Sequence, residues 1–353
     1  MTVRVGIIGA GAIARYHLQQ YLATPQAQVV AICDVLPERA AALAAEFGIP
    51  AVDGDYAALL ARPEIDAVSI CTPNDSHAPA AIAAARAGKH ILCEKPLALS
   101  VAEAAAMLAA VEAAGVHHVV NFSKRPFPGI VRLAALLADG ELGAVLQIET
   151  TYLQSWLLAP TLSGDPRRRL WRLDRRVAGS GALGDLGSHQ IDLAHHLVGP
   201  IRRVVGLLET KARHAPVAGA VDLATLDIDD HATFIADFGG GVSGTFVSSR
   251  VAAGTRDDLT FAVYGTRGAA RFSNLEPERL AVCLGEANLK YRLWSELPCP
   301  LPPGTPPSLM AAFVRGIAAG APATPTFADG LRCQAVLAAV EQSARGGAWV
   351  TVD

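Results

Sequence analysis

The sequence predicts an α/β domain with a parallel sheet, followed by an α+β domain with a large, open and mostly antiparallel sheet. Over the first third of the chain, short apolar runs alternate with amphipathic segments of helical length, a pattern typical of a parallel sheet covered on both faces. After about residue 123, strand-like segments follow one another with few helices between them, which favours antiparallel pairing. The length of 353 residues is that of about two domains.

The elements of the first domain, residues 1–123, follow from the change of apolar period along the chain. We expect strands at Val3–Ile8, Val29–Cys33, Ala67–Cys71, His90–Cys93 and His118–Phe122. We expect helices at Ala12–Ala23, Pro37–Phe47, Ala78–Ala87 and Val101–Ala114.

The second domain, residues 124–353, has strand-like runs separated by glycine turns at 239–241 and 265–268. We expect strands at Val145–Leu153, Arg203–Glu209, His231–Phe238, Val242–Ser249 and Leu259–Tyr264, and helices at Ile130–Ala138 and Asp329–Ala344. The last helix is a candidate to pack back on the first domain. The proline-rich stretch 297–307 is expected to be a surface excursion.

Composition and charge exclude several function classes. The chain is 51% hydrophobic and 18% charged, with a formal net charge of -3, so it lacks the basic surface that nucleic acids or anionic membranes attract. No apolar run reaches the roughly 18 residues of a spanning helix, and the N-terminus lacks the order of a signal peptide. Six scattered cysteines without a CxxC pair are expected to be buried thiols. We therefore expect a cytoplasmic protein.

A glycine-rich loop joins the first strand to the first helix. Gly9-x-Gly11-x-x-Ala14 is the dinucleotide pattern of the Rossmann fold, in which Gly9 makes the tight turn, Gly11 lets the backbone approach the pyrophosphate and Ala14 keeps the helix close. Asp34 ends the second strand, where an acid binds both ribose hydroxyls and favours NAD over NADP. Arg39 leaves NADP open, since it is able to accommodate a 2′-phosphate.

Polar segments follow the third and fourth predicted strands. Residues 72–77 follow the third, and Glu94, Lys95 and Pro96 follow the fourth. Because ligands bind at the carboxyl ends of strands in open α/β sheets, both segments are expected to reach the ligand. A loop lysine is usually solvated, but the position of Lys95 directly beyond an apolar strand favours a functional role.

A stripe of acids and histidines is expected in the second domain. Asp185, His189, Asp192 and His196 recur at spacings of four, three and four, which would place them on one helix face. Such a stripe is typical of a zinc site, a proton-transfer site or a polar helix edge. No cysteine or third ligand cluster accompanies it, so we expect no metal. We interpret its N-terminal end as catalytic and its C-terminal end, with the neighbouring His195, as structural.

Together these motifs resemble the Gfo/Idh/MocA oxidoreductases, over nearly the whole chain. The resemblance rests on the glycine loop, the Glu94-Lys95-Pro96 turn, Gly184-Asp185 with His189 and Asp192, and the segments 140–145, 152–156, 171–174, 178–185, 264–268 and 325–330. It implies a Rossmann domain followed by a substrate-binding and oligomerisation domain, and a homodimer or homotetramer. It also implies a cis Lys95–Pro96 bond and Lys95, Asp185 and His189 as the catalytic residues.

The chemistry of these residue types agrees with that implication. A neutral imidazole near physiological pH is suited to remove a hydroxyl proton, which makes His189 the candidate base. An ammonium group stabilises a developing alkoxide, which is the role expected of Lys95. Asp185 is expected to orient His189 or to hold Lys95.

Further residues are expected to line the ligand sites. The cofactor-binding set is Gly9, Gly11, Ala12, Ile13, Asp34, Thr72, Asn74, His77, Glu94 and Lys95. The substrate-binding set is Lys124, Gln154, Trp156, Arg172, Asp185 and His189, with Gln154 and Trp156 on one face of a strand. Lys124 departs from the aromatic residue usual in the resembling dehydrogenases, which favours either an acidic sugar such as a uronate or a lysine that faces solvent.

The sequence thus predicts an NAD-dependent oxidoreductase that oxidises a secondary hydroxyl of a sugar, anhydrosugar or cyclitol. An NADPH-linked reductase of a keto-sugar and a glycoside hydrolase with a retained NAD are the alternatives. A non-enzymatic sensor is the third, ranked lowest because such proteins are expected to lose Lys95 or His189.

Overall fold

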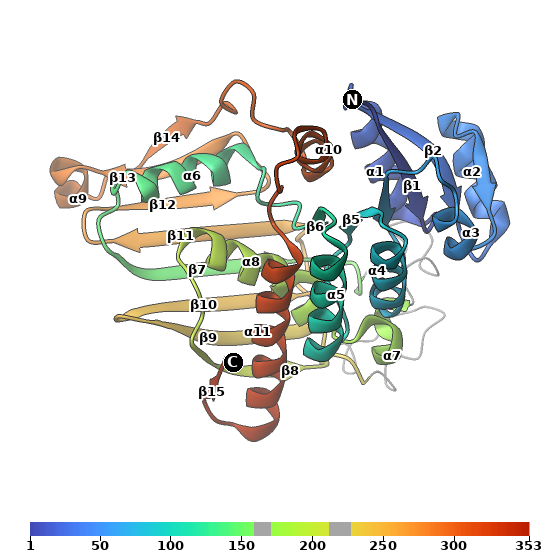
Figure 1. Cartoon of the computed structure of the whole chain (residues 1–353). Helices are drawn as coiled ribbons and strands as arrows, with labels where there is room; N and C mark the ends of the chain where they lie inside the picture. Colours follow the sequence, from blue (N-terminus) through green and yellow to red (C-terminus); the bar gives the residue numbers. More distant parts are fainter. Residues whose placement is uncertain (159–170, 212–226, 353) are drawn as a thin grey trace. The chain divides into compact units, whose positions relative to one another are not determined.

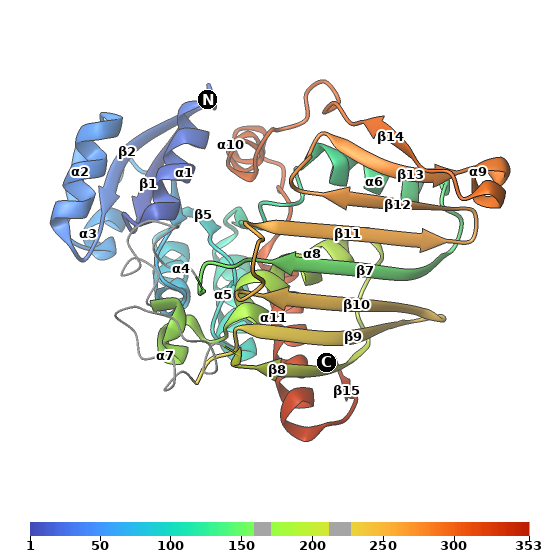
Figure 2. The same ribbon diagram turned by 180° about the vertical axis from the view of Figure 1, so that it is seen from behind.

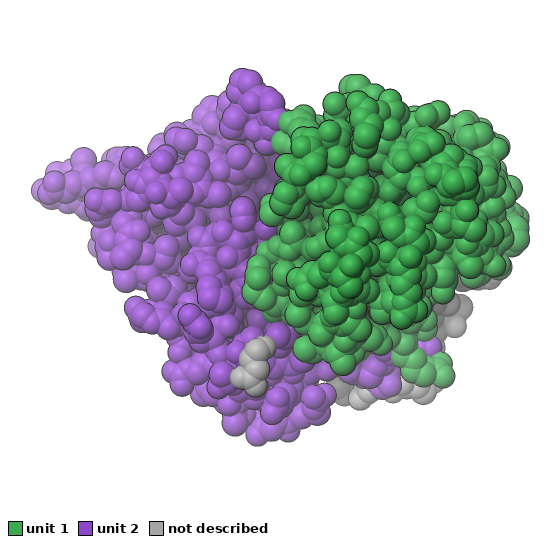
Figure 3. All heavy atoms as spheres, in the orientation of Figure 1, with its two compact units in different colours: residues 1–122, 176–179, 306–334 green, residues 123–175, 180–305, 335–353 purple. Residues whose placement is uncertain are grey.

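A computed structural model describes residues 1–158, 171–211 and 227–352. The chain divides into two compact units, which Figure 3 colours separately. Unit 1 contains residues 1–122, 176–179 and 306–334, and unit 2 contains residues 123–175, 180–305 and 335–353. Each unit is built on its own sheet.

The sheet of unit 1 has six parallel strands in the order β3-β2-β1-β4-β5-β6. The strands are β1 (Val3–Ile8), β2 (Ala27–Cys33), β3 (Ala51–Asp53), β4 (Ala67–Ile70), β5 (His90–Cys93) and β6 (His118–Val120). Every residue of β4 is buried, because helices cover both faces of a parallel sheet and leave no polar side to the strand. The predicted parallel α/β domain is confirmed.

Helices of unit 1 follow the strands in the alternation that the sequence predicts (Figure 1). They are α1 (Ala12–Leu22), α2 (Pro37–Phe47), α3 (Tyr56–Leu60), η1 (Asn74–Ser76), α4 (His77–Arg86), α5 (Val101–Ala114) and α10 (Leu309–Ala319). Helix α5 begins where predicted because the Ser100 hydroxyl accepts the Glu103 backbone N–H, which is the usual N-cap bond. Helices α4 and α5 pack together, as do α1 and α10.

Besides the single turn η1, three elements of unit 1 have no counterpart in the sequence predictions. Strand β3 and helix α3 have only three and five residues, which is too short for a period to emerge. Helix α10 lies far along the chain, yet its Phe313 and Val314 are fully buried in the core that also contains β1 and α1. Its amphipathic pattern alone does not reveal which sheet it joins.

The sheet of unit 2 has nine strands in the order β14-β13-β12-β11-β7-β10-β9-β8-β15. They are β7 (Val145–Leu153), β8 (Arg203–Glu209), β9 (His231–Gly239), β10 (Val242–Ser249), β11 (Asp258–Gly265), β12 (Gly268–Ser273), β13 (Arg279–Leu284), β14 (Ser295–Pro298) and β15 (Val350–Thr351). Neighbouring strands are antiparallel except β7 and β10, which are parallel. The predicted mostly antiparallel sheet is confirmed, although the sequence analysis did not identify β12, β13 and β14.

Helices lie against one face of this sheet. Helix α6 (Pro128–Ala138) contacts β12 and β13, and α8 (Ser188–Leu197) contacts β7. Within the described residues of unit 2, no helix covers the opposite face, which Figure 2 shows. The remaining helical segments are α7 (Arg175–Ala178), the π-helical turn η4 (Leu183–Gly187), α9 (Glu286–Tyr291) and α11 (Phe327–Gly346), with α7 and α11 divided between the units.

Candidate active site

The glycine loop of unit 1 lies at the carboxyl end of β1. Gly9 has a φ of 93°, and a Cβ at this position would lie 2.9 Å from the Cys71 carbonyl carbon and oxygen. A larger residue is therefore excluded. At Gly11 a Cβ would meet nothing within 4 Å, so this backbone faces open space on the side where a ligand is able to approach.

The N-terminus of α1 is open to an anion. No side chain caps this helix, and its first turn contains no acidic residue. The backbone N–H groups of Ala12 and Ile13 belong to the first turn, where helices leave N–H groups without intrahelical acceptors. Together with the helix dipole, these groups favour a phosphate.

Asp34 connects β2 to the glycine loop. Its carboxylate accepts the backbone N–H of Ala10 at 2.6 Å and that of Leu36 at 2.9 Å. A carboxylate has about four lone-pair sites, so capacity remains for the hydroxyls of a ribose. The Thr72 hydroxyl, beyond β4, is buried and has no hydrogen-bond partner within the described ranges. Both observations agree with a bound dinucleotide.

Asn74 and His77 hold loops of unit 1. The Asn74 amide donates to the Ala178 carbonyl at 2.9 Å. The ring nitrogens of His77 lie 3.0 Å from the Pro96 carbonyl and 3.1 Å from the Thr72 carbonyl. Burial lowers the pKa of His77, although these two carbonyls oppose the shift. The imidazole therefore connects the Thr72 and Pro96 loops.

The turn after β5 contains Glu94 and Lys95. The Lys95–Pro96 bond is cis, as the resemblance implies. The Glu94 carboxylate is buried and lies 2.7 Å from His17 Nε2, and it accepts the Asn121 amide at 2.6 Å. Burial opposes ionisation of Glu94, but the bonds to His17 and Asn121 and the charge of Lys95 outweigh it and lower the pKa of the carboxyl. Glu94 is thus held as an anion beside Lys95.

Sequence reasoning missed the partners of Glu94. The other ring nitrogen of His17 lies 2.7 Å from the Ser69 hydroxyl, which also accepts the Tyr21 hydroxyl at 3.2 Å. The available signal is that His17 shares the inward face of α1 with Ala14 and Tyr21. A histidine in an otherwise apolar stripe needs buried hydrogen-bond partners.

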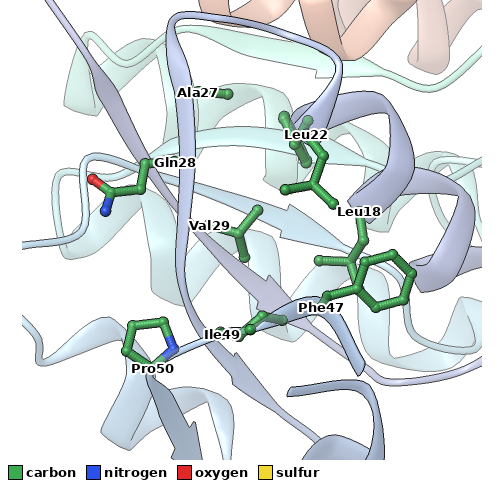
Figure 4. A pocket seen from close by; sticks show the side chains of 10 residues that line it. Leu18, Leu22, Ala27, Gln28, Val29, Phe47, Ile49 and Pro50 are labelled. Carbon is green, nitrogen blue, oxygen red and sulfur yellow. The ribbon is translucent and has the colours of Figure 1, made fainter. Parts of the chain in front are cut away.

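An apolar hollow in unit 1 lies away from these residues. It has a volume of about 330 Å³ and is lined by Leu18, Val29, Phe47 and Ile49, among others (Figure 4). It includes Ala27, the first residue of β2, whereas the cofactor residues follow the carboxyl ends of the strands. The hollow is therefore separate from the candidate cofactor site.

In unit 2, the stripe of acids and histidines begins with a π-helical turn, η4. At the start of η4, the carboxylate of Asp229 accepts the Gly181 N–H at 2.7 Å and the Leu183 N–H at 2.8 Å. The Ala182 N–H donates to the Asp229 carbonyl at 2.9 Å. Asp229 thereby satisfies backbone donors that a helix end leaves without acceptors. Turns of this kind are frequent at functional sites.

Asp185 lies in this turn between two guanidinium groups. Arg250, which is fully buried, donates from Nη2 to Asp185 Oδ2 at 3.0 Å. Arg172 Nε lies 3.8 Å from the same oxygen. Arg250 also donates to the Arg172 carbonyl and lies over the Trp156 ring. Asp185 is therefore an anion fixed by cations of its own unit, a connection that sequence spacing does not reveal.

His189 lies four residues after Asp185, at the start of α8, and is buried, with 5% of its surface exposed. Its ring lies 5.9 Å from the Tyr152 ring, centroid to centroid. Asp192, one turn later, accepts hydrogen bonds from the guanidinium of Arg125, the shortest of which is 2.6 Å. His196 is exposed and His195 half-buried.

The predicted substrate residues occupy different positions from those expected. Gln154 and Trp156 were expected on a strand, but β7 ends at Leu153 and both residues follow it. The Gln154 amide donates to Asp257 Oδ1. Lys124 was left either to bind an acidic sugar or to face solvent, and its side chain is only 12% exposed. The solvent-facing alternative is therefore wrong.

Within the described ranges, no group of three or more His, Cys, Asp or Glu side chains is placed to hold a metal ion. Nor does any described helix have the length and apolar character needed to cross a membrane.

Comparisons with known proteins agree with this geometry. Residues 3–122 match the profile described as the Gfo/Idh/MocA oxidoreductase family with an NAD-binding Rossmann fold, and residues 130–271 match the C-terminal domain of that family. Levoglucosan dehydrogenase of Pseudarthrobacter phenanthrenivorans is 33% identical over 99% of this chain and 98% of its own length. Inositol 2-dehydrogenase of Rhizobium meliloti is 30% identical over 81% of this chain and 80% of its own length. A solved levoglucosan dehydrogenase in complex with NADH and levoglucosan matches with a TM-score of 0.91 and 32% identity over 100% of both chains.

Proposed function

The chain belongs to the Gfo/Idh/MocA oxidoreductase family, and we propose that it oxidises a secondary hydroxyl of a sugar, anhydrosugar or cyclitol with NAD. The observation that supports this most strongly is the similarity over the full chain length to a dehydrogenase of levoglucosan. Lys95, Asp185 and His189 are all present at the positions that match the family motif.

NAD would be held by unit 1. Gly9, Gly11 and the N–H groups of Ala12 and Ile13 would bind the pyrophosphate, because this helix end is uncapped and favours anions. Asp34 would bind the ribose hydroxyls, and the buried Thr72 hydroxyl would supply a further polar contact. Bound NAD supplies the hydride acceptor.

Asn74, His77 and Glu94 would serve the cofactor mainly by positioning. Asn74 and His77 bond to backbone carbonyls, so they fix the loops that follow β4 and β5. Glu94 is held as an anion by His17 and Asn121, which places a fixed negative charge beside Lys95.

His189 would act as the base that removes the hydroxyl proton of the substrate. A neutral imidazole is suited to this task near physiological pH. Lys95 would donate to the same oxygen and stabilise the alkoxide that develops. Asp185, held by Arg250 and Arg172, would orient His189 or hold Lys95.

Replacement of Lys95 by alanine tests this assignment. We expect turnover to fall by about 10²–10³-fold or more, because the alkoxide loses its charged donor, while NADH binding is retained. The measurement is NADH absorbance during incubation with NAD or NADP and levoglucosan, myo-inositol or D-glucose. The exposed Lys290 provides the matched control, Lys290→Ala, which we expect to keep wild-type turnover. Full activity of Lys95→Ala would contradict the role of Lys95 in stabilising the alkoxide.

A further inference from the structure

One carboxylate of unit 2 connects several side chains of the candidate substrate site. Asp257 precedes β11, and its Oδ1 accepts the Tyr152 hydroxyl at 2.8 Å and the Gln154 amide. Its other oxygen, Oδ2, lies 3.7 Å from Lys124 Nζ. Sequence reasoning did not single out Asp257, and these contacts assign it a place in the site.

Tyr152 connects this group to the candidate base. Its ring lies 5.9 Å from the His189 ring, and its hydroxyl reaches Asp257. Burial raises the pKa of the Tyr152 phenol well above its usual value, and the charge of Asp257 adds to the shift. The phenol therefore remains a hydrogen-bond donor. Tyr152 contacts both Asp257 and His189, and its side chain links the two.

Lys124 is enclosed by the same residues. Its ammonium lies 5.2 Å from the Phe127 ring centre and 5.5 Å from that of Tyr152, in addition to its contact with Asp257. Aromatic faces and a carboxylate both stabilise a cation. The charge of Lys124 is therefore compensated within the protein.

The other cations near the stripe are also matched by a carboxylate. Arg250 and Arg172 both face Asp185, and Arg125 faces Asp192. A carboxylate on the substrate would have to compete with Asp185, Asp192 or Asp257 for these cations, and it would experience repulsion from all three. Hydroxyl groups compete without that repulsion, since they donate to carboxylates as well as accept from cations.

We propose that Asp257 is a specificity-determining residue. By pairing with Lys124, it compensates the positive charge of that lysine, so that the site favours uncharged polyols over acidic sugars. This inference rests on the proposed function and narrows its substrate class. When Asp257 loses its charge, Lys124 should become an uncompensated cation that is able to bind the carboxylate of a uronate.

The test compares D-glucose with D-glucuronate, which differ by a carboxylate in place of a hydroxymethyl group. The variant is Asp257→Asn, which removes the charge but keeps an oxygen that is able to accept from Tyr152. We expect the wild type to prefer D-glucose, both in turnover with NAD and in equilibrium binding to the NADH-bound enzyme. In Asp257→Asn the preference should move toward D-glucuronate by about tenfold.

Two further variants identify the cause of such a change. Lys124→Met combined with Asp257→Asn should lose the gain for D-glucuronate, whereas a gain that persists would indicate another cation and overturn the role of Lys124. Glu276→Gln removes one exposed negative charge from the same unit and should leave the preference within about twofold of wild type.

The outcomes separate the two proposals. Turnover of neutral polyols with the same preference in Asp257→Asn as in wild type overturns the specificity role and leaves the proposed function intact. A wild-type preference for D-glucuronate overturns it as well. If the wild type oxidises no neutral polyol, the proposed function fails, and a stronger binding of D-glucuronate by Asp257→Asn still supports the inference. Binding of neither sugar by the wild type or any variant overturns the specificity role, and turnover of levoglucosan and myo-inositol then decides the proposed function.

Discussion

At the scale of single residues, the candidate chemistry depends on charges that are fixed by other charges. Asp185 is only 19% exposed at its side chain and is bound by Arg250, which is 1% exposed. Breaking such a buried pair leaves an uncompensated charge, which costs more than the intact pair contributes. We therefore expect Arg250 to act as a positioning residue through Asp185.

Replacement of Arg250 by methionine should lower both stability and turnover. We expect the free energy of unfolding to fall by about 3–5 kcal/mol and kcat by about 10- to 100-fold, since Asp185 loses its main partner. Arg250→Lys, which restores the charge, should recover part of kcat. Denaturant unfolding and initial rates measure these effects. Arg202→Met, at an exposed arginine, is the control, and equal losses in both variants would contradict the positioning role.

The burial of His77 predicts that the stability of the protein depends on pH. Its pKa is lowered by burial from a usual value of 6.5, so on acidification the unfolded chain binds a proton before the folded chain does. Stability should therefore fall as the pH decreases below about 6.5, with a slope of at most about 1.4 kcal/mol per pH unit from this residue. We expect His77→Asn to show a smaller loss of Tm between about pH 8 and about pH 5 than wild type. A difference from wild type that is constant with pH would argue against this origin.

At the scale of elements, the π-helical turn η4 and helix α8 present Asp185 and His189, the side chains proposed to be catalytic. The backbone at Gly181 passes so close to the Asp229 carbonyl that a Cβ would lie 1.6 Å from its oxygen. The Asp229 carboxylate accepts two N–H groups of the same segment. The segment is thus held by one residue from just before β9, and the position of Asp185 depends on it.

Replacement of Asp229 by alanine should displace this segment. Two buried N–H groups would lose their acceptor, at about 1–3 kcal/mol each, and turnover should fall with Tm. Asp227→Ala is the matched control, because Asp227 is exposed and the contacts described for it use its carbonyl. Thermal unfolding and initial rates give the comparison. If Asp227→Ala and Asp229→Ala had the same effect, the capping role would be wrong.

At the scale of the whole molecule, elements distant in sequence combine in each unit. Unit 1 takes α10 from beyond residue 306 into the core that begins with β1. In unit 2, β7 pairs in parallel with β10 although nearly a hundred residues separate them, and it pairs with β11 on its other edge. These neighbours decide which residues meet at the end of β7, where Gln154 reaches Asp257.

The fold class and the motif residues were accessible from the sequence because their signals are local. Apolar period, caps and glycine turns act within a few residues, so β1, α2, β5, α5, β7, β8 and β10 have the predicted bounds. The glycine loop and Asp34 were identified for the same reason. The short elements β3 and α3 were missed because a few residues contain no period.

What the sequence by itself determined is the parallel α/β domain, the antiparallel α+β domain and the residue types suited to NAD-linked hydroxyl chemistry. What only the tertiary structure decided is the set of partners: His17 with Glu94, Arg250 with Asp185, Asp229 with η4, and Asp257 with Lys124. The two partners in each case lie 48 to 133 positions apart in the sequence. Their physical cause is the burial of polar groups, which must find partners wherever the fold places them, and no local pattern records where that is.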